Sequence, residues 1–424
     1  MLNDRYDMPL STASQKARDL YVKGVDIYLA LGIGADDTLE QAIAEDPGFA
    51  LAYAALARVH HVNGKGRAAR QAMTEARARL DGLTAREASH IDVLGTMIDG
   101  DSVGATAKAR AHLQDHPRDA LVAQSCLGVF SLIGFSGEKG REQDCHALAT
   151  ALAPHYGDDW WFLSSLAFAE TEVGRTDAAT RSIERSIALN PRNANAAHHR
   201  SHLYYELGET RAGLDYLEDW QKGYAREGLL YCHLSWHRAL WSMNAGDVAR
   251  MWSIVDAEIV PPQDHAPAIN VLTDLAAILF RAELAGHEVA RERWQAASAF
   301  AADKFARPGI AFADVHAALA HAMAGDSEAL SRLRAEAKGP AADLVVTLSE
   351  SFEALAAQNW AEAATGLQKT LNEHERIGGS RAQRDLIEHA LVAANLRLGN
   401  SEVAAKLLTR RPKTATAGVV KGAA

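Results

Sequence analysis

Two pairs of histidines are the residues of this sequence best suited to chemistry. His198 and His202 lie four residues apart in AHHRSHLYYELG, and His233 and His237 have the same spacing in YCHLSWHRALW. Residues four apart share one face of an α-helix, so each segment would present two imidazoles together. Clustered imidazoles suit metal ligation, proton transfer near neutral pH, or binding of a polar ligand. A metal ion held by all four is one open interpretation, although neither pair carries the glutamate of an HExxH zinc hydrolase.

Two aspartates on later segments could orient a histidine that acts in catalysis. Asp274 lies in LTDLAAILFRAELAG and Asp314 in FADVHAALAHAMAGD, each within a predicted helix. A histidine that acts as a general base is commonly oriented by a third group such as a carboxylate. The candidate catalytic residues are therefore His198, His202, His237, Asp274 and Asp314. The alternative is that each aspartate is a polar packing residue satisfied by a neighbouring helix.

Aromatic residues and one glycine-containing segment add candidates for ligand contact. Tyr205 and Trp236 lie close to the histidine pairs in the sequence. In GGSRAQRD, paired glycines permit positive φ, and Ser380 or free amides at a helix start could bind an anion. The alternative is an ordinary loop in which Ser380 caps the final helix pair. Arg384 and Asp385 could equally form a structural ion pair.

A repeat of about 34 residues predicts the helices that position these side chains. Between Trp160 and Pro191, Gly174 fits the turn of a tetratricopeptide unit, and Ala167 and Ala179 fit the two positions where its helices cross. One helix pair cannot bury its apolar stripe alone, so neighbouring pairs stack. The sequence therefore predicts an all-α, tetratricopeptide-type solenoid of about ten helix pairs, curled into a superhelix or a closed ring. Its turns are expected at Gly64, Gly100, Gly134, Gly174, Gly208, Gly246, Gly286, Gly325, Gln358 and Gly399.

In such a solenoid, the first helix of each pair lines the concave surface. We therefore expect an inner groove lined by histidine, aromatic and acidic side chains. The alternative is a generic helical bundle in which histidines scatter and bond to neighbours. The inward positions of the repeat hold His198, His202, Tyr205, His233, Trp236 and, in the last unit, His389.

Charge and composition argue against several classes of protein. The 424 residues carry a formal net charge of −10, which lacks the basic footprint that phosphate binding needs, so we expect no nucleic-acid partner. The three cysteines have no CxxC spacing, which argues against a disulfide framework and a zinc ribbon. The N-terminus lacks an apolar signal region, and no stretch approaches the length of a membrane span. We expect a cytoplasmic protein with no membrane partner.

The chain divides into three expected parts. Residues 1–20 form an N-terminal arm, and residues 21–410 form the solenoid. Residues 411–424 form a flexible tail, because RRPKTATAGVVKGAA shows no hydrophobic periodicity.

Several segments from about residue 40 onward resemble the tetratricopeptide repeat protein 38 family. They are DPGFALAYAALA, HPRDAL, HLSWHRALW, TDLAAILFRAELAG, FADVHAALA and GGSRAQRDL, and the resemblance covers nearly the whole chain. It implies the solenoid fold but no particular reaction. The chain departs from the family at Arg381, where a histidine commonly precedes AQRD, and between Cys145 and Trp161, which implies an altered ligand. As ligand contacts, the resemblance implies His233, Trp236, His316, Ser380, Gln383, Arg384 and Asp385.

Three functions remain open on these grounds. The first is a binding module whose groove holds a small polar molecule or a peptide. The second is an enzyme of the hydrolase or lyase type that uses the histidines and aspartates, either without a cofactor or with a metal ion. The third is a structural scaffold, and association with a second copy of the chain is compatible with each of them.

Overall fold

Paired antiparallel helices make up almost all of the structure. The computed structural model describes residues 2–262, 266–414 and 419–423, and these contain twenty-two α-helices. A small antiparallel hairpin of β1 (Leu2–Asn3) and β2 (Pro9–Leu10) precedes them. The all-α helical-repeat fold predicted from the turn spacing is confirmed. None of the described helices combines the length and the apolar character that crossing a bilayer requires.

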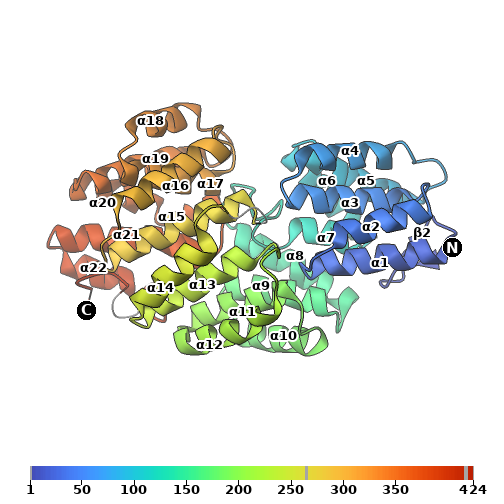
Figure 1. The fold of residues 1–424 in the computed structure, drawn as a ribbon, viewed down its shortest axis with the longest axis horizontal. Helices are drawn as coiled ribbons and strands as arrows, with labels where there is room; N and C mark the ends of the chain where they lie inside the picture. The colour runs from blue at the N-terminus through green and yellow to red at the C-terminus, as the bar shows by residue number, and fades with distance from the viewer. Residues whose placement is uncertain (1, 263–265, 415–418, 424) are drawn as a thin grey trace.

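Figure 1 shows the helices in three groups. The group on the right comprises α1 (Gln15–Leu29), α2 (Ala35–Glu45), α3 (Ala50–Val62), α4 (Gly66–Arg77), α5 (Ala85–Ile98), α6 (Ser102–Asp115), α7 (Ala120–Cys126) and α8 (Arg141–Tyr156). The group below comprises α9 (Trp160–Glu172), α10 (Thr176–Leu189), α11 (Ala194–Leu207), α12 (Thr210–Trp220), the 3₁₀ turn η1 (Gln221–Gly223), α13 (Tyr231–Asn244), α14 (Val248–Ile254) and the π turn η2 (Val255–Ile259). The group on the left comprises α15 (Ala268–Leu284), α16 (Arg291–Lys304), α17 (Ala311–Ala324), α18 (Ser327–Glu336), α19 (Ala342–Ala356), α20 (Trp360–Thr370), the 3₁₀ turn η3 (His374–Ile377), α21 (Arg381–Arg397) and α22 (Ser401–Leu408).

Caps and small residues explain why each unit folds as two antiparallel helices, and α9 with α10 is an example. The Asp159 side chain caps α9 by accepting a hydrogen bond from the backbone N–H of Phe162. Gly174 forms the turn with a φ of 78°, a left-handed value that favours glycine. Ala167 and Ala179 are buried in one apolar cluster between the helices. Their small side chains let the two backbones approach closely.

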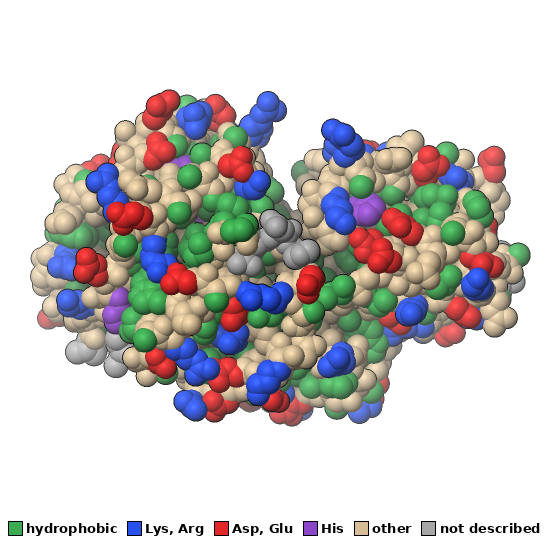
Figure 2. Space-filling view, in the orientation of Figure 1, with side chains coloured by type: hydrophobic (Ala, Val, Ile, Leu, Met, Phe, Trp, Pro, Cys, Tyr) green, Lys and Arg blue, Asp and Glu red, His purple; other side chains and the backbone are tan. Residues whose placement is uncertain are grey.

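Two large apolar clusters fill the two ends of the molecule. One extends from Tyr6 to Ala169 and the other from Tyr205 to Val420. Smaller clusters around Ile183 and Leu214 support the helices between them. The two ends are separated by a notch that is visible at the top of Figure 2. The helices α9–α12 therefore join two separately packed halves.

Helix α21 packs across the inner side of the solenoid. It contacts α11 and α15, and η3, which precedes it, contacts α8 and α17. Arg141 of α8 donates hydrogen bonds to the carbonyl oxygens of Glu375 and Gly379. On α9, the Glu172 carboxylate accepts a hydrogen bond from the backbone N–H of Arg381. The C-terminal part of the chain thus covers the inner surface that α8, α9 and α11 present.

The segment around Gly134 differs from the turn that the repeat predicts there. Residues 127–140 form a long loop between α7 and α8. Within it, the Gly134 backbone N–H donates to Ser131 Oγ at 2.9 Å. The loop also reaches η3, where Arg376 Nε donates to the Gly137 carbonyl at 3.1 Å. Because the loop is longer than a regular turn, it can reach η3 and make this contact.

The two ends of the chain are more ordered than their composition suggests. Helix α1 begins at Gln15, inside the expected N-terminal arm. Within the expected tail, Val419 and Val420 are buried, and the Lys421 backbone N–H donates to the Leu284 carbonyl at 2.7 Å. Burial of these two apolar side chains stabilises the contact of this segment with α15. The rest of the expected tail includes residues 415–418 and 424, which lie outside the described residues.

Candidate metal centre

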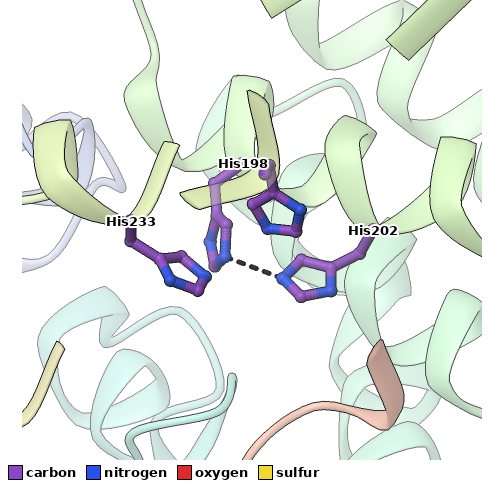
Figure 3. Close-up of side chains that lie close together, drawn as sticks. His198, His202 and His233 are labelled. Carbon is purple, nitrogen blue, oxygen red and sulfur yellow. Dashed lines mark hydrogen bonds between the residues drawn. The ribbon is translucent and has the colours of Figure 1, made fainter. Parts of the chain in front are cut away.

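The two histidine pairs lie together in the interior of the molecule. Helix α11 carries His198 and His202, and α13 carries His233 and His237. Each side chain offers one ring nitrogen as a possible metal ligand. These four nitrogens all lie within 4.8 Å of one another. Figure 3 shows His198, His202 and His233 pointing toward one another, with a hydrogen bond of 2.7 Å between Nε2 of His198 and Nε2 of His202. We call these four residues the histidine cluster.

The residues around the histidine cluster leave it enclosed. On α11, Ala196, Ala197 and Ser201 are all fully buried, and their small side chains allow close packing of the neighbouring helices. Ser201 Oγ donates to the Ala197 carbonyl at 2.9 Å, which satisfies the hydroxyl within its own helix. Phe168 of α9 covers one side, with its ring centroid 5.4 Å from that of His202. The histidines therefore occupy an interior site and not the wall of an open groove.

Burial favours the neutral form of three imidazoles of the cluster. It lowers the pKa of His198, His202 and His237 well below the usual value, and neighbouring histidines lower it further. Both ring nitrogens of His237, and Nδ1 of His202, have no hydrogen-bond partner among the described residues. A buried polar atom without a partner costs about 1–3 kcal/mol. Neutral imidazole nitrogens of this kind are the commonest metal ligands in proteins.

Asp274 of α15 holds the ring of His233 in place. The Nδ1 of His233 lies 2.8 Å and 3.0 Å from the two carboxylate oxygens of Asp274. Burial raises the pKa of Asp274, and His233 opposes that rise. Because Nδ1–H donates to the carboxylate, the lone pair of Nε2 is left for ligation, as in many metal-bound histidines. The Trp236 ring stacks on His233 with centroids 5.4 Å apart and an interplanar angle of 8°.

Asp314 and His316 lie on α17, outside the histidine cluster. Asp314 Oδ2 accepts a hydrogen bond of 2.9 Å from the Gly309 backbone, and burial raises the pKa of Asp314 to about 6. His316 Nδ1 lies 2.7 Å from the Phe312 carbonyl, and burial lowers its pKa to about 4. Asp314 thus bonds to the backbone just before α17, and His316 to the backbone of its first turn.

The GGSRAQRD segment forms a cap at the start of α21. Ser380 and Gln383 make a reciprocal capping box, in which each side chain accepts a hydrogen bond from the backbone of the other. Gly379 has a φ of 75°, and a Cβ at this position would lie 2.3 Å from the Phe312 ring. Only glycine permits this close approach, so the segment positions α21 on the inner surface.

Arg384 and Asp385 pair with other helices and not with each other. Arg384 forms a buried ion pair with Glu142 of α8. Asp385 forms an ion pair with Arg411 and accepts a hydrogen bond of 2.7 Å from the Tyr205 hydroxyl. Burial alone would raise the pKa of Asp385, but Arg411 and other nearby cations lower it.

His389, one helical turn beyond Asp385, contacts Arg281 rather than the histidine cluster. Its Nδ1 lies 3.5 Å from Nη1 of Arg281, and burial lowers its pKa to about 4. Arg281 also donates to the Ala382 carbonyl at 2.6 Å, which attaches α15 to α21.

A layer of buried charges under α21 was missed by sequence reasoning. No motif marks these residues, because their partners come from distant helices, such as Glu142 and Arg384, which are 242 residues apart. The buried charges are Arg141, Glu142, Glu172 and Arg281, and the partly buried Arg411 lies with them.

Comparison with known proteins finds distant structural likenesses. No protein-family model matches the sequence. A human IFIT1 dimer with m7Gppp-AAAA aligns over 99% of this chain and 96% of its own, at 13% identity and a TM-score of 0.44. A tetratricopeptide repeat protein from Parabacteroides merdae aligns over 79% of this chain and 99% of its own, at 11% identity and a TM-score of 0.29. These likenesses concern the helical-repeat fold alone.

One expectation from the net charge needs correction. The charge of −10 led us to exclude a nucleic-acid partner, and this exclusion is wrong because the structures of similar fold include IFIT1 with capped RNA. Net charge is a sum over the whole molecule, whereas a ligand responds to the local field of the surface that it contacts. The helix pairs and their stacking show one class: the chain is a helical-repeat protein of the tetratricopeptide type.

Proposed function

We propose that this protein is a metalloprotein in which the histidine cluster holds one divalent transition-metal ion. The observation that carries the proposal is the convergence of four buried imidazoles, with ligand atoms within 4.8 Å of one another. Neutral imidazole suits zinc, iron, copper and nickel, whereas calcium and magnesium take oxygen ligands. Because these side chains are enclosed, an ion fits the cluster better than a peptide or a polar metabolite does.

The spacing of the ligand atoms supports this proposal. Zn–N bonds of about 2.0–2.1 Å in a tetrahedral site bring the nitrogens to roughly 3.3 Å from one another. The cluster spans 4.8 Å at most, so each nitrogen needs to move by less than about 1 Å. The closest pair, at 2.7 Å, would separate slightly as the proton between His198 and His202 is replaced by the ion.

The surroundings of the cluster also favour an ion. The Asp274 carboxylate orients His233 and supplies a negative charge that offsets part of the charge of a buried cation. Trp236 and Phe168 cover the rings on two sides and exclude water. The outer partner, the neutral ligands and the apolar shell are the parts that a stable buried metal site requires.

We further propose that the chain belongs to the tetratricopeptide repeat protein 38 family. The segments of resemblance support this assignment because they include the site. HLSWHRALW contains His233, Trp236 and His237, and TDLAAILFRAELAG contains Asp274. A generic repeat has no structural need for these residues.

Metal analysis of purified protein tests the proposed centre. We expect about one zinc, iron, copper or nickel ion per chain by inductively coupled plasma mass spectrometry, in line with one four-ligand site. His198→Ala and His237→Ala should each remove most of the metal. His199→Ala is the matched control, because His199 is equally buried on the same helix but bonds to Ser164.

Two results would contradict the proposal. The first is wild-type protein that stays metal-free after incubation with each of these ions. The second is equal metal loss in His199→Ala and His198→Ala. If the cluster variants do not fold, the free energy of unfolding of chelator-treated wild-type protein is measured with and without added metal. Metal at 100 times its dissociation constant should add about 2.7 kcal/mol, and no increase would contradict the proposal.

A further inference from the structure

A cavity lies beside Phe168, whose ring also contacts the histidine cluster. It is small and partly open to solvent, and it lies between α8, α9, the 127–140 loop and the loop before α21. Phe168 lines this cavity and also contacts the His202 ring. We call it the Arg141–Glu172 cavity, after the two polar side chains on which the inference depends.

Arg141 is fixed in the wall of this cavity by two of its three nitrogens. Its Nε and Nη2 donate to the carbonyl oxygens of Glu375 and Gly379. No hydrogen bond joins its Nη1 to another described residue. The guanidinium is 5% exposed, so it is a buried and rigidly held cation with one donor edge left for a ligand.

Glu172 supplies a second unsatisfied group in the same wall. One carboxylate oxygen, Oε2, accepts a hydrogen bond of 2.9 Å from the backbone N–H of Arg381. The other, Oε1, is buried and has no partner among the described residues. A buried carboxyl oxygen left in this state costs free energy unless a ligand or a proton satisfies it.

The charges around the cavity show what kind of ligand would satisfy both groups. Burial and the nearby Arg384 lower the pKa of Arg141 to about 10. Burial and the nearby Glu142 raise the pKa of Glu172 to about 7. Near neutral pH, Glu172 can therefore carry a proton while the guanidinium groups stay charged. A bound anion would then be stabilised by the positive charge that remains in the site. The charged groups packed around Glu172 are Arg141 and Glu142 of α8, Glu206 of α11, and Arg381 and Arg384 of α21.

We propose that the Arg141–Glu172 cavity binds a small carboxylate anion, which accepts hydrogen bonds from Arg141 Nη1 and from the protonated carboxyl of Glu172. A planar monoanion fits one guanidinium edge. The apolar walls formed by Phe168 and Ala169 suit a short aliphatic or keto substituent. A phosphate dianion is disfavoured, because Glu142 adds negative charge to the same wall. This inference does not rest on the metal proposal, since no ligand of the cluster lines the cavity.

Calorimetric titration with sodium acetate tests the proposal. The full-length protein is titrated as isolated and again after chelator treatment, so that a failure of the metal proposal leaves this test intact. We expect one acetate per chain in both samples, and binding of acetamide or phosphate at least about tenfold weaker. Because binding requires the proton on Glu172, acetate affinity should be about tenfold higher at pH 6 than at pH 8.

Matched variants separate the cavity from nonspecific effects. Arg141→Met should abolish acetate binding, whereas Arg86→Met, at an equally buried arginine of the N-terminal half, should not. Glu172→Gln keeps a donor and should bind acetate with less than about twofold dependence on pH, whereas Glu170→Gln should behave as wild type. The proposal is overturned if wild-type protein shows no acetate binding, or if Arg141→Met binds as wild type does. If Arg141→Met does not fold, an unchanged pH dependence in Glu172→Gln overturns it instead.

Discussion

Replacing Asp274 with asparagine is the sharpest perturbation of the histidine cluster. Asparagine has the same shape and keeps an oxygen that accepts the hydrogen bond from His233 Nδ1, which is now 2.8 Å from the carboxylate. The substitution removes only the negative charge. Outer carboxylate partners of metal-bound histidines typically contribute about 10–100-fold in metal affinity, or about 1.4–2.7 kcal/mol. We expect Asp274→Asn to lose affinity within this range.

The assay is a competition titration for Zn²⁺ between the metal-free protein and a chelating indicator. Asp314→Asn is the matched control, because Asp314 is also a buried carboxylate with a raised pKa but lies outside the cluster. Circular dichroism before each titration checks that both variants keep their helix content. The control should bind Zn²⁺ as the wild type does.

Two results would refute this reasoning. If Asp274→Asn binds Zn²⁺ as tightly as the wild type, the charge of the carboxylate does not act on a metal ligand. If Asp314→Asn loses as much affinity as Asp274→Asn, the effect comes from general destabilisation. A loss confined to Asp274→Asn supports both the ligand and its outer partner.

Two further predictions concern the stability of the fold. Metal-free protein should become less stable as the pH falls, because the folded-state pKa values of His198, His202 and His237 lie below their unfolded value near 6.5, so the unfolded chain takes up protons first. Between pH 7.5 and 5.5 these three residues would lower the free energy of unfolding by up to about 4 kcal/mol, measured by urea denaturation, and a flat profile would contradict their burial in neutral form. Gly379→Ala should cost about 1–3 kcal/mol or more, because a Cβ there combines a φ of 75° with contact at 2.3 Å to Phe312. Gly246→Ala has a similar φ of 85° and open space around it, so a thermal melt that shows equal losses in both would rule out the contact with Phe312 as a cause.

The fold class could be predicted because each helix pair is determined by residues close together in the sequence. A cap such as Asp159, a turn glycine such as Gly174 and small residues such as Ala167 act within one unit. The same pattern recurs along the chain, so one unit predicts the architecture of the next. The spacing of His198 and His202 likewise predicted that both side chains lie on one face of a helix.

The covering of the inner surface could not be predicted in this way. It depends on pairs such as Arg384 with Glu142, whose residues lie 242 positions apart and belong to no common motif. The repeat pattern describes how a helix packs on its neighbours, and it contains no information on a helix that crosses to the opposite side. For that reason the groove expected from the repeat is occupied by α21, and Glu172 and Arg141 gave no signal in the sequence.

The path of α21 has a consequence for how the protein unfolds. Linear repeat proteins often lose units from one end while the remainder stays folded, because each unit depends only on its neighbours. Here the last units hold α8, α9, α11 and α15 through Arg141, Glu172, Tyr205 and Arg281. Shortening the chain before α21 would strip partners from helices in the middle of the molecule. Removal of the last units should therefore destabilise the middle of this protein as well, instead of shortening it one unit at a time.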